Sequence, residues 1–162
     1  MPETVIHPLA PIADEHSRIL ILGTMPSPRS RAEGFYYAHP QNRFWRVLAA
    51  IYGEALPCTN EERTAFLLRH GIALWDVLQS CTITGASDSS IRQPVANDIA
   101  ELLRQYPGIT RICTTGKEAA RLYRRYCLPH THMEAIPLPS TSAANAACGL
   151  ESLISSYRKV LL

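Results

Sequence analysis

Residues 18–23, RILILG, restrict the possible fold classes more than any other stretch of this chain. Four consecutive aliphatic residues follow an arginine, and a glycine ends the run. A short apolar run of this kind is typical of a strand that is buried on both faces of a parallel sheet. Three other stretches also indicate short strands, namely IALWDVL (72–78), TRICTTG (110–116) and MEAIPLP (133–139). The sequence therefore predicts four buried strands.

Segments with helical character separate these strands. NRFWRVLAAIYG (42–53) places its apolar residues on one helix face and ends in glycine. NEERTAFLLRH (60–70) predicts a second helix, with Asn60 as its N-cap. Further helices are expected at about 96–105, 117–126 and 150–161, whereas TITGASDSS (82–90) is expected to be a polar loop.

Strands that alternate with helices predict an α/β fold, in which a parallel sheet carries helices on both faces. No internal repeat or low-complexity linker interrupts the pattern, so we expect a single domain over residues 1–162. Ligands of such sheets bind at the carboxyl ends of the strands. Those ends are occupied here by the stretches GTMPS, DVLQS, TTGKE and LPSTS, all of them small, polar or rich in Gly and Pro.

The composition is that of an ordinary soluble globular protein, with 46% hydrophobic and 19% charged residues. A net charge of +2 permits a polyanionic partner without requiring one. Only Lys117 and Lys159 are lysines among the sixteen basic residues. Arginine suits phosphates and base stacking, but a general arginine bias explains the count equally well. The apolar runs are too short to span a bilayer, so no membrane partner is expected.

The five cysteines are far apart and include no CxxC pair. Their odd number, and the lack of a signal peptide pattern, predict reduced thiols and a cytoplasmic location. The spacing fits neither a zinc site nor an iron–sulfur cluster, and His130 and His132 lack a third ligand. We therefore expect no metal.

Several common catalytic motifs are missing from the chain. Without GxGxxG or GxxxxGK(S/T), the usual nucleotide-cofactor enzymes are disfavoured, and without GxSxG an esterase is disfavoured. A small-molecule α/β hydrolase would need a nucleophile paired with a base, and we locate no such pair.

The stretch FYYAHPQNRFWR (35–46) concentrates aromatic, polar and cationic side chains. Its three successive aromatic residues cannot all face one way, so at least one should border a cleft, where a ring can stack on a base. Asn42 could hold a water or a base edge, or it could simply cap the helix that follows. His39, before Pro40, could be a buried and hydrogen-bonded group.

Three motifs, ILGTMPSPRS (21–30), FYYAHPQNRFW (35–45) and LPSTSAANA (138–146), occur in an order that resembles the uracil-DNA glycosylase superfamily. Within it, the chain is most similar to the hypoxanthine-DNA (deoxyinosine) glycosylases, which GIALWDVLQSC and DSSIR also fit. AHPQNRFW is similar to the mismatch-specific uracil-DNA glycosylases as well. The resemblance covers about residues 18–160. It implies a three-layer α/β/α sandwich with a central four-stranded parallel sheet, and hydrolysis of the N-glycosidic bond of a base flipped out of DNA.

The resemblance also implies roles for residues around the base. Most of the superfamily has a water-positioning Asp or Asn where this chain has Met25, so the amide oxygen of Asn42 is expected to orient the water instead. Tyr37 aligns with the base-stacking aromatic. Asp76 falls where relatives carry a base-reading Asn, and it suits the N–H of a lactam, although it could equally be a helix cap or an ion-pair partner. Backbone N–H groups around Gly23, Thr24, Met25 and Ser27 are expected to receive the base carbonyl.

The last motif is implied to grip DNA. Ser140, Thr141 and Ser142 fit phosphate contacts, as do Ser27 and Lys117. Asn145 could reach into the space that the flipped base leaves, or could be a helix cap, while the neighbouring alanines are too small for a wedge. His39 and Pro40 are expected to support the aromatic loop.

The expected enzyme needs no cofactor and acts on DNA as a monomer. Because the aromatic loop has no lysine to form a Schiff base, a monofunctional hydrolase is favoured. A uracil or mismatch-specific uracil-DNA glycosylase is an alternative. A second alternative is a nucleic-acid-binding module that kept this fold and lost catalysis, as Met25 would suggest.

Overall fold

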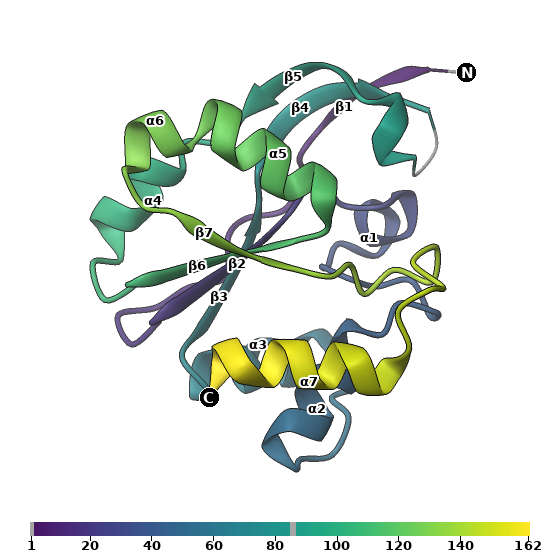
Figure 1. Ribbon diagram of the computed structural model, residues 1–162, viewed down its shortest axis with the longest axis vertical. Coiled ribbons are helices and arrows are strands. Elements are labelled where there is room, and N and C mark those ends of the chain that lie inside the picture. The colour runs from purple at the N-terminus through teal and green to yellow at the C-terminus, as the bar shows by residue number, and fades with distance from the viewer. Residues whose placement is uncertain (1, 85–86) are drawn as a thin grey trace.

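A four-stranded parallel sheet runs through the centre of the protein (Figure 1). The computed structural model describes residues 2–84 and 87–162. The strands are β2 (Ile19–Gly23), β3 (Ile72–Asp76), β6 (Arg111–Thr115) and β7 (Ala135–Leu138), and their spatial order is β3-β2-β6-β7. Each neighbouring pair is parallel. All four predicted strands are confirmed.

Helices cover both faces of this sheet (Figure 1). One face carries α4 (Ile99–Gln105), α5 (Lys117–Tyr126) and α6 (Leu128–Thr131), and the other carries α2 (Phe44–Tyr52), α3 (Asn60–Arg69) and α7 (Leu150–Leu161). Strand β2 explains the arrangement, because Ile19 and Ile21 pack into one apolar core while Leu20 and Leu22 pack into the other. The three-layer α/β/α sandwich is confirmed.

A second, antiparallel sheet was not expected from the sequence. It consists of β1 (Glu3–Ile6), β4 (Leu78–Ile83) and β5 (Arg92–Ala96), in the order β1-β4-β5. The prediction of a loop is wrong for residues 82 and 83, which lie in β4; residues 85–86 lie outside the described part of the chain. Register shifts break the pairing of β4 and β5, which hid those two strands, and β1 is only four residues long with a single buried residue.

Two helix starts depend on local capping. The N-cap of α3 is Thr59 rather than Asn60, because Thr59 and Glu62 form a reciprocal capping box. A short helix, α1 (Pro28–Glu33), lies inside the loop after β2, and Ser27 caps it with Pro28 at the first helical position. Helices α5 and α7 have the predicted bounds.

Candidate active site

The carboxyl ends of the parallel strands lie next to α1 and to the loop that precedes α7 (Figure 1). Residues of these segments line an open cleft. Its volume of about 1310 Å³ exceeds the roughly 300–1,000 Å³ of small-molecule sites, which favours an extended ligand. Thirteen of the fourteen residues predicted for the site line it: Gly23, Thr24, Met25, Ser27, Tyr37, His39, Asn42, Asp76, Lys117, Ser140, Thr141, Ser142 and Asn145. The other, Pro40, is exposed on the adjacent turn.

Tyr37 presents an aromatic face to this cleft. Its ring stacks on Phe44, with centroids 3.9 Å apart and planes 8° apart, and its hydroxyl lies 3.3 Å from Thr115 Oγ1. Tyr37 also has a φ of 52°, a left-handed conformation that aromatic residues rarely adopt outside functional sites. Burial, reinforced by the charge of Asp76, raises the pKa of Tyr37, so its phenol stays neutral. The stack on Phe44 and the contact with Thr115 therefore fix the orientation of the ring at the cleft.

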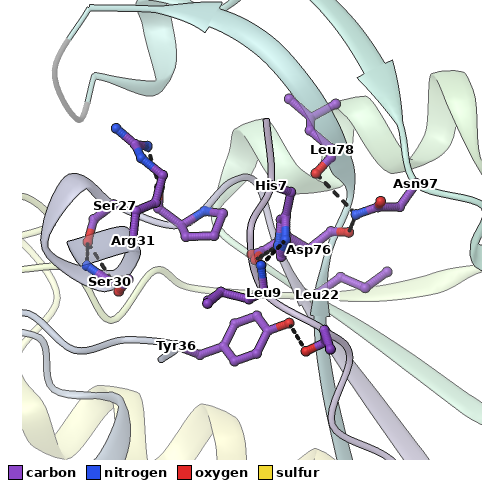
Figure 2. Close-up of polar contacts among 12 residues, drawn as sticks. His7, Leu9, Leu22, Ser27, Ser30, Arg31, Tyr36, Asp76, Leu78 and Asn97 are labelled. Carbon is purple, nitrogen blue, oxygen red and sulfur yellow. Dashed lines mark hydrogen bonds and ion pairs between the residues drawn. The ribbon is translucent and has the colours of Figure 1, made fainter. Parts of the chain in front are cut away.

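Asp76 forms the deep end of the cleft. It is 4% exposed, and its Oδ2 lies 2.7 Å from Nε2 of His7 (Figure 2). Its Oδ1 lies next to Gly23, since a Cβ on that glycine would be 2.5 Å from this oxygen. Asn97 donates from Nδ2 to the Asp76 carbonyl at 2.9 Å, which fixes the backbone. Asp76 is not a helix cap. It does pair with a side chain of another segment, as the ion-pair alternative expected, but its partner His7 was not predicted.

The Asn42 amide oxygen is already engaged. It accepts hydrogen bonds from the Phe44 N–H at 2.9 Å and from the Thr141 hydroxyl at 2.8 Å. These bonds use both lone pairs of the oxygen and fix the orientation of the amide. Asn42 thus bonds the first N–H of α2 from the position before the N-cap, which is Arg43. Within the described part of the chain its Nδ2 has no hydrogen-bond partner, so the group left for a ligand or a water is a donor, not the oxygen that the sequence suggested.

The Arg43 side chain binds the backbone of the loop that contains the last motif, PSTSAANA. Its guanidinium donates to four backbone carbonyls of one loop, those of Thr141, Ser142, Asn145 and Cys148. Its own backbone N–H also donates to the Thr141 carbonyl, at 3.1 Å. The side chain therefore joins the aromatic loop to the PSTSAANA loop.

The serines of that loop keep a donor for an outside partner. Ser140 Oγ accepts from the Ser142 N–H at 3.1 Å, and Ser142 Oγ accepts from the Ala144 N–H at 3.2 Å. Each hydroxyl proton remains available to an acceptor such as a phosphate oxygen. Thr141 differs, because it is 1% exposed and donates to Asn42, so its hydroxyl is not a phosphate contact.

Three further predictions change with the structure. Asn145 donates from Nδ2 to the Ser140 carbonyl at 3.0 Å and so braces its own loop, and the N-cap of α7 is Gly149 instead. The Ser27 hydroxyl accepts from the Ser30 N–H and bonds the Ser30 hydroxyl (Figure 2), so it caps α1 rather than facing a phosphate. His39 is exposed, not buried, and its Nδ1 accepts from the Gln41 N–H.

The remaining predicted residues lie on the cleft surface. Met25 is partly buried against the core on the α4–α5 side of the sheet. Lys117 is exposed at the start of α5 and forms no ion pair within the described residues. The described residues contain no group of three or more His, Cys, Asp or Glu side chains able to hold a metal ion. Over the same residues, no helix is long and apolar enough to cross a membrane.

Known proteins are similar to this chain in sequence and in fold. A hypoxanthine DNA glycosylase of Methanosarcina acetivorans is 36% identical over 135 residues, covering 83% of this chain and 84% of the relative. A hypoxanthine DNA glycosylase of Methanosarcina barkeri is 36% identical over 110 residues, covering 67% and 70%. A solution NMR structure of a candidate uracil DNA glycosylase from M. acetivorans matches with a TM-score of 0.83 and 31% identity, covering 99% of this chain and 97% of that one.

The family model of the uracil DNA glycosylase superfamily matches residues 10–157, nearly the whole chain. This span includes the three motifs and all four strands of the parallel sheet. The chain belongs to the uracil DNA glycosylase superfamily.

Proposed function

We propose that this chain is a monofunctional DNA glycosylase that removes hypoxanthine, the deamination product of adenine, from DNA. The observation that carries the proposal is the meeting of Tyr37 and Asn42, from the aromatic stretch 35–46, with Asp76, from the end of β3, in one cleft. The two relatives with the name hypoxanthine DNA glycosylase support the choice of base.

The chemistry of the Asp76 carboxylate supports a deaminated base as the substrate. Adenine presents an acceptor at N1 beside an amino donor, whereas hypoxanthine presents an N1–H donor beside a carbonyl. A carboxylate oxygen such as Asp76 Oδ1 accepts from that N–H and repels the adenine N1 lone pair. Tyr37 would stack on the base, and backbone N–H groups of the loop after β2 would receive its carbonyl.

Asn42 then has the role of holding water at the sugar. The C1′–N9 bond breaks first, and its electron pair leaves with the base, which takes a proton. The water oxygen bonds to the cationic C1′ and releases a proton to solvent. Because the cation forms before attack, the water needs placement more than deprotonation. The Asn42 Nδ2 group can place it by donating to the water oxygen, since the amide oxygen is occupied.

The backbone of the DNA would lie on the loop of residues 140–148. The hydroxyls of Ser140 and Ser142 retain protons for phosphate oxygens, and exposed Lys117 adds a positive charge. No Schiff base is expected, so borohydride should trap no covalent complex; a trapped complex would instead indicate a bifunctional enzyme.

Single-turnover excision from oligonucleotides that carry inosine, uracil or xanthosine tests the proposal. We expect the fastest release from inosine, and a loss of about 10²–10³-fold in Asn42→Ala, the size typical of removing one such catalytic donor. Asn60→Ala is the matched control, because Asn60 is exposed on α3. Thermal unfolding of both variants is needed, since losing the hydrogen bonds that Asn42 accepts from Phe44 and Thr141 should cost about 1 kcal/mol each.

Other outcomes would assign a different function. Uracil as the best substrate would make the chain a uracil glycosylase. DNA binding without release of any of the three bases would support the module that lost catalysis. Near-normal excision by Asn42→Ala would move the water-holding role to another residue.

A further inference from the structure

His7 lies outside every motif that the sequence singled out, yet it contacts the deepest polar group of the cleft. It follows β1, and its Nε2 lies 2.7 Å from Asp76 Oδ2 (Figure 2). The two side chains are 2% and 6% exposed, so water does not compete for this bond. A buried pair of this kind fixes the position of both groups.

The proton on His7 can be assigned from its other ring nitrogen. The Leu9 N–H donates to Nδ1 at 3.2 Å, so Nδ1 carries a lone pair. The ring proton is therefore on Nε2, and it is donated to Asp76 Oδ2. His7 is a neutral donor in this arrangement, and Asp76 is the acceptor.

Among the residues that the structure describes, no hydrogen bond is made to the second carboxylate oxygen of Asp76, and the side chain has one fixed orientation. Asn97 donates to the carbonyls of Asp76 and Leu78, at 2.9 and 3.1 Å (Figure 2). Because Oδ2 is bonded to His7, Oδ1 is the oxygen that lies beside Gly23 and the Tyr37 hydroxyl, at the cleft. Besides His7, the titratable groups that face the carboxylate are the phenols of Tyr36 and Tyr37.

We propose that His7 is a positioning residue that sets which base edge the cleft accepts. Its Nε2–H bonds Oδ2 and so holds Oδ1 toward the base, so that the cleft presents an acceptor. An acceptor selects the N–H of a lactam and rejects the amidine edge of adenine. The inference rests on the proposed function, and it adds a residue, 69 positions from Asp76 in sequence, that determines specificity.

The fixed tautomer makes an unusual prediction for Asp76→Asn. With His7 present, the new amide must turn its oxygen toward the Nε2–H, so its NH₂ faces the cleft and opposes the N–H of hypoxanthine. We expect this variant to lose at least 100-fold in single-turnover release of hypoxanthine. Adding His7→Phe removes that constraint and lets the amide oxygen turn to the cleft. The double variant should therefore be at least fivefold faster than Asp76→Asn alone.

Single substitutions of His7 provide a second test of the same proposal. His7→Phe should slow excision about 10–100-fold while DNA affinity changes less than threefold, the pattern of a group that acts on the reacting complex. His7→Gln, whose amide can donate to Oδ2, should recover to within about fivefold of the wild type. His16→Gln and His16→Phe are the controls, because His16 is exposed on a loop.

The sign of the coupling between the His7 and Asp76 substitutions distinguishes a positioning role of His7 from a purely structural role. If His7 only stabilised the structure, His7→Phe would slow Asp76→Asn further, and that result would overturn the proposal. Failure of His7→Gln to recover, with its melting temperature unchanged, would also overturn it. The ¹⁵N–¹H spectrum of the histidine rings gives a readout that needs no activity, and a His7 proton on Nδ1, or on both nitrogens, contradicts the assignment. A wild type that releases no base would refute the proposed function and leave this spectrum as the test of His7.

Discussion

The two sides of the cleft are held in place by opposite means. We call Gly23, Tyr37, Asp76 and Thr115 the deep wall, and residues 140–148 the rim. In the deep wall, side chains from distant strands and loops bond one another: Asp76 bonds His7, and Tyr37 bonds Thr115. In the rim, the contacts to the rest of the protein are mainly hydrogen bonds that backbone carbonyls accept from the Arg43 side chain.

This difference matches two kinds of recognition. Telling one base from another requires a particular atom at a particular point, and buried side chains with a single satisfied geometry supply it. A DNA backbone repeats the same phosphates, so a loop of small residues with a few hydroxyl donors is sufficient. We therefore expect changes in the deep wall to alter catalysis and base choice, and changes in the rim to alter DNA binding.

The largest effect should come from adding one methyl group to the deep wall, in Gly23→Ala. The new Cβ would lie 2.5 Å from Asp76 Oδ1 and 3.2 Å from the Tyr37 hydroxyl, so both must move. A misplacement of about 1 Å near reacting groups costs about 100-fold, and we expect at least that loss in single-turnover excision.

The matched control for this change, Gly149, lies directly after the rim, at the N-cap of α7. Gly149 has no atom within 4 Å of a built Cβ, and its φ of −74° suits any residue. Gly149→Ala should keep the excision rate within about twofold of the wild type, since the added methyl group meets no atom. Its cost should fall on stability instead, at about 1 kcal/mol, because Ala is a poorer N-cap residue than Gly, and thermal unfolding measures that cost. Equal losses in the two glycine variants would break the contrast between wall and rim.

A smaller effect is expected when the rim loses its support, in Arg43→Ala and Arg43→Lys. Only a guanidinium can reach four carbonyls at once, so lysine should fail almost as fully as alanine. We expect DNA affinity to fall about tenfold in both variants. Hydrogen exchange should become faster in residues 140–148, while residues 72–76 keep their protection.

Arg46→Ala is the control for the rim, because Arg46 is exposed on the same helix. If Arg43 instead served as a plain positive charge for phosphate, Arg43→Lys would bind DNA like the wild type. That outcome, together with unchanged exchange in the rim, would show that the carbonyl contacts do not organise the loop.

The sequence predicted the parallel sheet and the members of the cleft well, because both depend on local patterns. An apolar run such as RILILG is enough to predict a buried strand. The carboxyl ends of parallel strands then place the following loops at one edge of the sheet. Three things had no local signal. His7 meets its partner 69 residues away, Arg43 faces carbonyls that only the folded loop presents, and irregular pairing conceals the second sheet. In each case the partner is set by tertiary structure and not by neighbouring residues.

The smallest effect should come from the edge of the cleft, in Lys117→Ala. Lys117 is exposed and forms no ion pair among the described residues, so its contribution to DNA binding would be purely electrostatic. A lysine on one phosphate adds about one counterion to those released on binding, and its removal should reduce the slope of log affinity against log salt by about 1. The affinity should fall a few-fold at moderate salt for inosine-containing and unmodified duplexes alike, with the excision rate of bound DNA unchanged. Lys159→Ala, which removes the same charge near the far end of α7, should leave the slope as it is. A loss confined to inosine-containing DNA would instead assign Lys117 to the deep wall, because only contacts with the base can distinguish the two duplexes.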